Sequence, residues 1–123
     1  MSSIRSQNTR AENFVFRELR KRKIYFQKHY KKTIGNPDIA LPRKKKAIFI
    51  DGDFWHGYRF DRLKQRLPKK YWLSKIENNI KRDHYYRTKL KSDGWKILRV
   101  WEHDLVKRAE ETISKIVHFL SED

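Results

Sequence analysis

The stretch that most constrains this chain runs from Ile48 to Gly57, where a short apolar run ends abruptly. Residues 47–51 read Ala-Ile-Phe-Ile-Asp, a pattern typical of a buried strand. A second acid, two large aromatic residues and a histidine follow at once. A strand that only filled a core would not normally end this way, because buried charge and exposed aromatic surface both cost free energy. We therefore expect a functional site at the end of this strand.

The charge of the chain points to a polyanionic partner. Thirty-one Lys and Arg residues against fifteen Asp and Glu residues leave a net charge of +16 in 123 residues. Nucleic acid is the favoured partner, although a ribosomal or chromatin-like role and an anionic membrane surface would also fit the charge.

The bulk properties also indicate the class of protein. The length suits a single domain covering residues 1–123. No apolar run is long enough to span a bilayer and no signal peptide is evident, so we expect no membrane association. The absence of cysteine fits a reducing cytoplasm.

Sequence periodicity predicts an α/β domain with a small mixed sheet flanked by helices. Residues 1–8 form a polar arm, and Thr9 to Glu12 has the form of a capping box. In the first helix, the buried positions are expected to include Phe14, Val15 and Leu19. In the longest helix, which Gly94 would end, an apolar face is expected from Trp72, Ile76, Ile80 and Leu90. The predicted helices span 9–23, 69–92 and 107–120, and the predicted strands span 24–26, 38–41, 47–51 and 95–101.

Two carboxylates are expected to meet at one end of the sheet. If the turn after residue 41 is centred near residues 44–45, Asp38 lies opposite Ile50 or Asp51. Close carboxylates repel unless a proton or cation separates them, and Mg²⁺ is the natural cation beside phosphates. His56 could accept a proton from water near neutral pH. Together with the basic surface, these groups favour phosphodiester hydrolysis.

Plainer interpretations exist for each of these residues. Asp38 could be a turn acid, Asp51 could belong to a hairpin turn, Glu12 could only cap its helix, and His56 could be an ordinary loop histidine. Asp83 lies on the inward face of the long predicted helix, where an acid needs a partner. It could pair with Arg87 or a lysine, or it could orient a catalytic histidine.

A series of landmarks covers about residues 1–106. They occur in this order: Ile4-Arg5-Ser6-Gln7-Asn8-Thr9, Glu12, Gly35-Asn36-Pro37-Asp38, Ile48 to Gly57, Trp72, Lys75-Ile76, Asn79, Arg82-Asp83, Gly94-Trp95 and Val100-Trp101-Glu102. At this spacing the chain resembles the very-short-patch repair (Vsr) endonucleases. That family has a restriction-endonuclease-like fold and nicks DNA at T:G mismatches, so the resemblance implies this fold and this activity.

The resemblance also implies a metal site. Asp38 would ligate Mg²⁺ by its side chain, helped by the main-chain carbonyl of Ile50. Glu12 would hold metal-bound water from the first helix. Asp51 would be either a second metal ligand or a group that orients water near the scissile phosphate.

The remaining implied roles concern water and DNA. His56 would activate the attacking water, and Asp83 would orient it. The arm of residues 1–8, with Arg5, would lie along the DNA. Adjacent aromatics on a strand point to opposite faces, so at most one of residues 54 and 55 enters the core easily. The aromatic wedge that enters the duplex would consist of Phe54, Trp55 and Trp72.

The sequence departs from the family in one respect. Well-studied members carry a structural zinc bound mainly by cysteines, and this chain has none. We therefore expect no structural zinc, although Asp and His can bind zinc. Asp53 and His103 stand where zinc ligands are expected. Our hypothesis is that they form a hydrogen-bonded ion pair that replaces part of the zinc link.

The sequence thus predicts a Mg²⁺-dependent DNA endonuclease that acts as a monomer on double-stranded DNA and nicks beside a T:G mismatch. One alternative is a Vsr-like homing or restriction-type endonuclease that cuts intact duplex DNA. Another is a basic nucleic-acid-binding module without catalysis, in which the acids are only turns and caps.

Overall fold

The computed structural model describes residues 10–52 and 70–122, without the side chains of residues 70–73. In this part of the chain, helices and strands form an α/β fold. The elements are α1 (Arg10–Lys21), β1 (Gln27–Lys28), β2 (Ile39–Leu41), a short 3-10 helix (Pro42–Lys44), β3 (Lys46–Asp51), α3 (Lys70–Ser92), β4 (Lys96–Trp101), α4 (Glu102–Lys107) and α5 (Ala109–Ser121).

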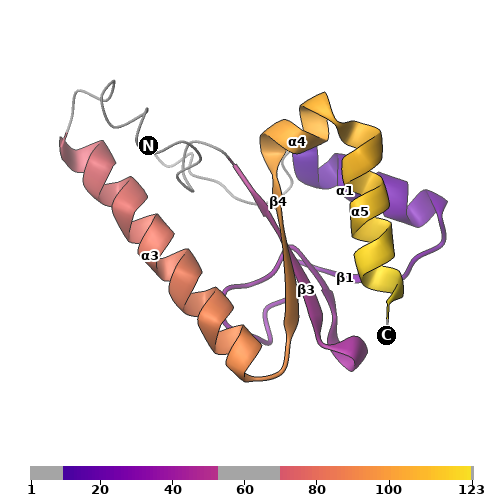
Figure 1. Cartoon of the computed structure of the whole chain (residues 1–123), viewed down its shortest axis with the longest axis horizontal. Coiled ribbons are helices and arrows are strands. Elements are labelled where there is room, and N and C mark those ends of the chain that lie inside the picture. Colours follow the sequence, from indigo (N-terminus) through magenta and orange to yellow (C-terminus); the bar gives the residue numbers. More distant parts are fainter. Residues whose placement is uncertain (1–9, 53–69, 123) are drawn as a thin grey trace.

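The four described strands form one mixed sheet in the order β1-β2-β3-β4. The first two pairings are antiparallel, and β3 and β4 run parallel. Figure 1 shows the sheet between two helical layers: α3 on one side, and α1, α4 and α5 on the other. This confirms the predicted α/β architecture of a small mixed sheet flanked by helices.

The strand directions bring the predicted carboxylates to one end of the sheet. Because β3 and β4 are parallel, their carboxyl ends lie side by side, with Asp51 paired to Trp101. Because β2 is antiparallel to β3, Asp38, which precedes β2, lies toward the same end. We call this end of the sheet, where Asp38 and Asp51 lie, the acidic edge.

The core lies between the sheet and the layer of α1, α4 and α5. Val15 and Leu19 of α1 are fully buried, as the sequence pattern predicts. The other buried core residues come from α1, from β2, β3 and β4, and from α4 and α5: Ala11, Phe16, Ile39, Ile48, Ile50, Val100, Leu105, Ile113, Ile116 and Leu120. Alternation along β3 therefore sends Ile48 and Ile50 into this core and Asp51 to the opposite face, toward α3.

Helix α3 ends where the sequence predicts. Gly94 has φ +92°, the left-handed conformation that follows many helix ends, and the amide of Trp95 donates to the carbonyl of Leu90 at 3.0 Å. Ile76 and Leu90 are buried, as expected from their spacing. None of the described helices is both long enough and apolar enough to cross a bilayer.

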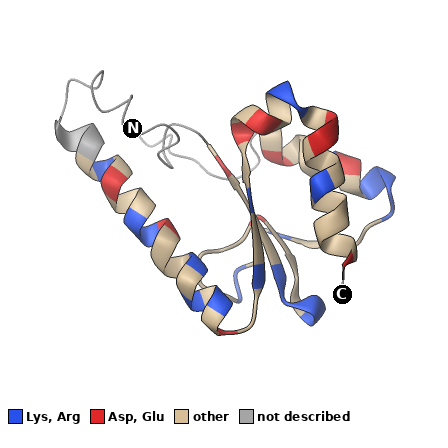
Figure 2. Ribbon diagram, in the orientation of Figure 1, with Lys and Arg blue, Asp and Glu red and all other residues tan. Residues whose placement is uncertain are grey.

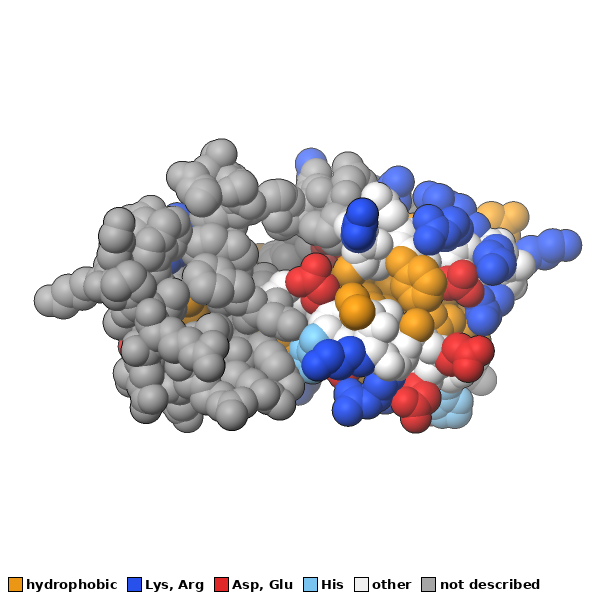
Figure 3. All heavy atoms as spheres, turned by 90° about the horizontal axis from the view of Figure 1, so that it is seen from above, with side chains coloured by type: hydrophobic (Ala, Val, Ile, Leu, Met, Phe, Trp, Pro, Cys, Tyr) orange, Lys and Arg blue, Asp and Glu red, His pale blue; other side chains and the backbone are white. Residues whose placement is uncertain are grey.

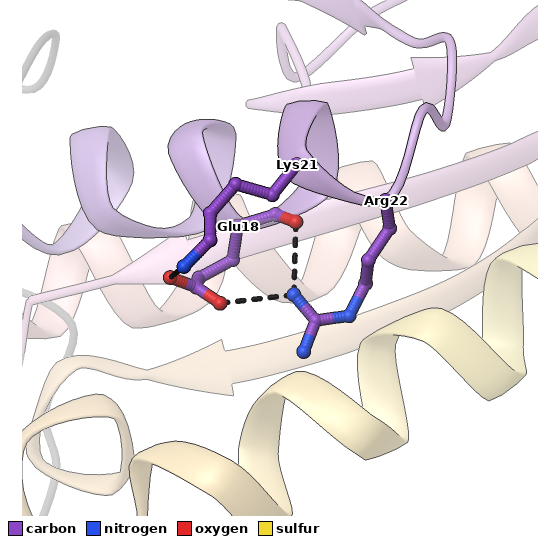
Figure 4. A network of polar contacts seen from close by, with 3 residues as sticks. All are labelled: Glu18, Lys21 and Arg22. Atoms are coloured by element: carbon purple, nitrogen blue, oxygen red, sulfur yellow. Dashed lines mark hydrogen bonds and ion pairs between the residues drawn. The ribbon is translucent and has the colours of Figure 1, made fainter.

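A surface ion-pair network stabilises the end of α1 (Figure 4). Glu18 accepts from Lys21 Nζ at 3.3 Å and from Arg22 Nη1 at 2.9 Å, and the same Arg22 atom binds the main-chain carbonyl of Glu18. The hydrogen bond from Arg22 is the main cause that lowers the pKa of Glu18, and the hydrogen bond from Lys21 lowers it further. The network closes the last turn of α1 before the chain turns toward the sheet.

The predicted strand at 24–26 is wrong, because the first strand begins at Gln27. The apolar alternation there is real: Ile24 and Phe26 pack against the core, while Tyr25 is 92% exposed. No ladder accompanies it, since pairing with β2 starts only at Gln27, opposite Ala40. The side chains of residues 24–26 therefore alternate between the core and solvent although this segment pairs with no described strand.

The predicted register between β2 and β3 is wrong by two residues. Leu41 pairs with Lys46 and Ile39 with Ile48, so Asp38 does not pair with Ile50 or Asp51. The reason is a tighter turn, which is a 3-10 helix closed by Lys45 at φ +53°. Asp38 nevertheless reaches the end of β3 through its side chain, which accepts a hydrogen bond from the Ile50 amide at 2.7 Å.

The predicted last helix at 107–120 corresponds to α5 (Ala109–Ser121), and a short helix that the sequence did not predict, α4, precedes it. Arg108 takes a non-helical conformation (φ −135°, ψ 54°) between α4 and α5. No glycine or proline marks this break, so the sequence pattern missed α4. The turn between α4 and α5 is stabilised by Thr112, whose hydroxyl donates to the carbonyl of Asp104 at 3.1 Å.

Candidate active site

A cluster of three side chains lies at the acidic edge. Glu12 comes from the first turn of α1, His29 follows β1, and Asp38 precedes β2. One ligand atom from each residue lies within 4.8 Å of the other two, and His29 Nε2 is 3.2 Å from Glu12 Oε1. Glu12 is almost fully buried, with 3% of its side chain exposed. We call these three residues the Glu12 cluster.

Asp38 is the most perturbed acid of this cluster. Burial raises its pKa to about 9, and the hydrogen bond with Glu12 acts in the same direction. The backbone amide of Ile50 donates to Asp38 Oδ2 at 2.7 Å, which opposes the rise in pKa. Two buried carboxyl groups therefore lie together where a cation could stand between them.

His29 is the member of the cluster that sequence reasoning missed. Its backbone amide donates to the carbonyl of Asp38 at 2.9 Å, which extends the pairing of β1 with β2 by one residue. Its ring meets the Phe16 ring edge-on, with centroids 5.6 Å apart. The pairing of β1 with β2 places the residue after Lys28 beside the residue before Ile39, but the sequence predicted no strand at Gln27–Lys28, so this signal was missed.

A second group of charges lies on the side of the sheet that faces α3. Asp51, at the end of β3, accepts a short hydrogen bond from Arg99 Nε of β4. The Nη2 atom of Arg99 is 3.5 Å from Asp83 Oδ2 of α3. One guanidinium thus joins an acid from the central strand to an acid from the long helix.

Among the described residues, Asp83 forms an ion pair with Arg99, a partner that sequence reasoning did not consider. The predicted pairing with His56 lies outside the described residues. Arg87 is nevertheless close: burial and the charge of Arg99 lower its pKa, whereas Asp83 and Asp51 raise it. Arg99 also lies over the Trp101 ring, with its guanidinium carbon 4.2 Å from the centroid. Its alternation with Ile97 and Trp101 marks an inward-facing arginine that sequence reasoning did not use.

The Glu12 cluster has the donor set of a divalent-metal site. It offers two carboxyl groups and an imidazole nitrogen from three segments, close enough together to surround a cation. Asp51 is buried nearby, and its negative charge raises the pKa of Asp38 further. Within the described residues, this is where a metal ion could be held.

Several predicted site residues lie outside the described part of the chain: Arg5, Asp53, Phe54, Trp55 and His56. Trp72 lies in α3, but its side chain is not described. The pairing proposed between Asp53 and His103 is likewise untested. His103 itself stacks on Trp101, with centroids 6.2 Å apart, and its Nε2 is 3.4 Å from Asp104 Oδ1.

A groove of about 640 Å³ lies between α1 and α4. Arg10 and Arg17 of α1 line it, together with Glu102, Leu105 and Val106 of α4. Figure 3 looks down on the molecule from the side where α4 lies and shows hydrophobic side chains among acidic and basic ones. Val106 is 76% exposed there. The groove begins at the turn of α1 that carries Glu12.

Comparison with known proteins matches residues 1–62 to the family described as DNA mismatch endonuclease Vsr. The type II nicking enzyme V.NmeDIP of Neisseria meningitidis serogroup C is 32% identical over 118 residues, which cover 94% of this chain and 80% of that protein. V.XorIIP, a type II nicking enzyme of Xanthomonas oryzae, is 39% identical over 108 residues (85% and 78%). The DNA mismatch endonuclease Vsr of Escherichia coli K12 is 33% identical over 89 residues (72% and 57%).

Proposed function

Because the chain belongs to the Vsr family of DNA mismatch endonucleases, we propose that it hydrolyses one phosphodiester bond of duplex DNA beside a T:G mismatch, using Mg²⁺. The observation that carries this proposal is the Glu12 cluster, in which two buried carboxyl groups and an imidazole converge at the acidic edge. A net charge of +16 supports a DNA substrate.

In this proposal the chain holds the metal through the acidic edge. Asp38 and Glu12 would be its side-chain partners, with the carbonyl of Ile50 and the carboxylate of Asp51 close by. The amide of Ile50 fixes the orientation of Asp38 by its 2.7 Å hydrogen bond. The ion, when bound, would stabilise negative charge on the phosphate and acidify a water molecule.

The proton would be taken from water by His56, which Asp83 would orient. Support for the position of Asp83 comes from Arg99, which ties it to the end of the central strands. The aromatic wedge that enters the duplex beside the mismatch would consist of Phe54, Trp55 and Trp72, because unstacking a mismatched base step costs less free energy than unstacking a paired one.

The DNA would approach the acidic edge. In Figure 2, Lys and Arg crowd the opposite end of the sheet at the turn between β2 and β3, whereas acids lie at the upper end. The arginines of the groove, Arg10 and Arg17, are the described cations on α1 that flank this upper end. The arm of residues 1–8, with Arg5, would continue this contact, and one protein molecule would act on each site.

A nicking assay tests the function. We expect strand nicking of a T:G duplex that requires Mg²⁺, with much slower nicking of the matched T:A duplex. Asp38→Ala should abolish nicking yet bind DNA at least as tightly, since a negative group near phosphate is gone. Equal nicking by the wild type and Asp38→Ala would contradict the assignment of the site.

A second candidate is the nicking of intact duplex DNA at a recognition sequence. It is favoured by the relatives, several of which are named type II nicking enzymes. Equal nicking of the T:G and T:A duplexes would support this candidate over mismatch repair. Trp72→Ala should then leave substrate preference unchanged, whereas a wedge role requires that it weaken mismatch preference more than affinity for the backbone.

A further inference from the structure

We propose that His29 is a metal ligand in the Glu12 cluster, and that its imidazole nitrogen makes the centre prefer a first-row transition ion such as Co²⁺ over Mg²⁺. The inference rests on the proposed function, because it concerns the same metal centre. It adds a nitrogen donor to a site for which the sequence implied only oxygen donors.

The geometry brings the His29 nitrogen to the carboxylates. Nε2 lies 3.2 Å from Glu12 Oε1, and one ligand atom of each residue lies within 4.8 Å of the others. Ligand bonds to such ions are about 2.0–2.2 Å long, so three atoms at this spacing can close on one ion with small side-chain shifts. His29 is only 15% exposed, so few other partners compete for its ring.

The position of His29 is set by the fold and not by a free loop. Its backbone amide is bonded to the carbonyl of Asp38 at 2.9 Å, so both residues belong to the same paired segment. The Phe16 ring packs edge-on against the imidazole and restricts its rotation. A donor held by both backbone and ring packing loses little freedom when it binds an ion.

The donor set decides which ion fits. Mg²⁺ prefers oxygen ligands, demands octahedral geometry and keeps several waters, so a nitrogen donor adds little to its binding. Co²⁺ accepts imidazole together with carboxylate, and its affinity for mixed donors exceeds that of the earlier first-row ions. A centre of two carboxylates and one imidazole should therefore discriminate between the two ions.

The plainer interpretation is that His29 only hydrogen-bonds to Glu12. In that case, replacing the imidazole by an amide that keeps the hydrogen bond should leave metal affinity unchanged for every ion. If His29 is a ligand, the same replacement should weaken only the ions that accept nitrogen. His29→Gln separates the two interpretations, and His118→Gln is the matched control, because His118 is exposed and pairs with Glu122 at 3.0 Å.

The experiment titrates the metal-free full chain with Co²⁺, followed by its electronic absorption, and with Mg²⁺ in competition. We expect His29→Gln to lose Co²⁺ affinity by at least about tenfold, with a change in Mg²⁺ affinity of less than about threefold. His118→Gln should match the wild type for both ions. Unchanged Co²⁺ affinity in His29→Gln would overturn the proposal, as would an equal loss for both ions.

Two further measurements keep the outcome decisive. Pulsed EPR of wild-type protein loaded with Mn²⁺ should detect a coordinated imidazole nitrogen, so the test survives if His29→Gln does not fold. If His56→Gln removes that nitrogen signal and His29→Gln does not, the inference is wrong. Asp38→Asn should lose both ions; if it binds them like the wild type, the metal centre of the proposed function is itself misplaced.

Discussion

The carboxyl group of Asp38 is stable in the folded protein mainly as the neutral acid. Its pKa is raised to about 9 by burial and by the bond to Glu12, compared with about 3.9 in an unfolded chain. A raised pKa stabilises the fold fully below the unfolded value, and this contribution is lost as the pH rises through the folded value. The metal-free protein should therefore lose stability between about pH 4 and about pH 9 through this group.

Asp38→Asn tests this dependence, because an amide mimics the protonated acid. We expect the melting temperature of the metal-free variant to exceed that of the wild type by an amount that grows as the pH rises. Thermal melts in a chelator at several pH values measure it. A difference that stays constant across the pH range would show that Asp38 does not titrate as described.

Arg99 joins Asp51 to Asp83, and both acids are largely buried, with 7% and 18% of their side chains exposed. Arg99→Met should cost about 1–3 kcal/mol in the free energy of unfolding, since charged hydrogen bonds are lost in a partly dry site. Arg108→Met is the matched control. Its pair with Asp104 is exposed, so its loss should cost less than about 1 kcal/mol. Denaturant unfolding measures both, and equal losses would contradict the stabilising role of Arg99.

Two glycines end turns in the left-handed conformation, but only one is crowded. A Cβ on Gly94 (φ +92°) would lie 3.6 Å from the Lys45 side chain, which is ordinary contact. Gly94→Ala should therefore cost about 1 kcal/mol, from backbone strain alone. A Cβ on Gly35 (φ +80°) would come within 3.1 Å of Tyr86 Cβ, so Gly35→Ala should cost more. Calorimetry of the two variants checks the order, and the reverse order would refute it.

At the scale of elements, the sequence predicts the pieces that carry a strong period or a clear boundary. The amphipathic spacing of Val15 and Leu19, the stop at Gly94 and the apolar run of β3 are all confirmed. The errors arise where tertiary contacts decide. At residues 24–26 the side chains alternate between buried and exposed, but the segment pairs with no described strand. The break at Arg108 depends on how α4 and α5 pack, and no local residue type predicts it.

The active-site residues were predictable to different degrees, for a physical reason. Asp38 and Asp51 stand beside strand boundaries, so their approach follows from strand direction, whereas the role of Glu12, on the first helix, came from the family resemblance. His29 lies in a basic segment where the sequence predicted no strand, and Arg99 lies on the predicted last strand among apolar neighbours. Their importance comes from the pairing of β1 with β2 and from the packing of β4 against α3, which the sequence pattern does not give.

The charge of the whole molecule predicts a strong dependence of DNA binding on salt. With a net charge of +16, a footprint of about six phosphate contacts would reduce affinity about a thousandfold between about 50 and 200 mM NaCl. Binding of Asp38→Asn to uncleaved duplex in a chelator measures this dependence without nicking. A slope near zero would mean that the excess charge does not face the DNA.

Lys46, the first residue of β3, connects this strand to the end of α5. It is 1% exposed, and its ammonium group donates to the carbonyls of Phe119 and Glu122 at the end of α5. If the last turn frayed, this buried cation would lose its acceptors, so fraying there is coupled to the sheet. Amide protons of the last turn of α5 should therefore exchange unusually slowly for a helix end. Lys46→Met should accelerate their exchange while leaving the amides of the middle of α5 unchanged; hydrogen-exchange measurements that found no difference would contradict the coupling.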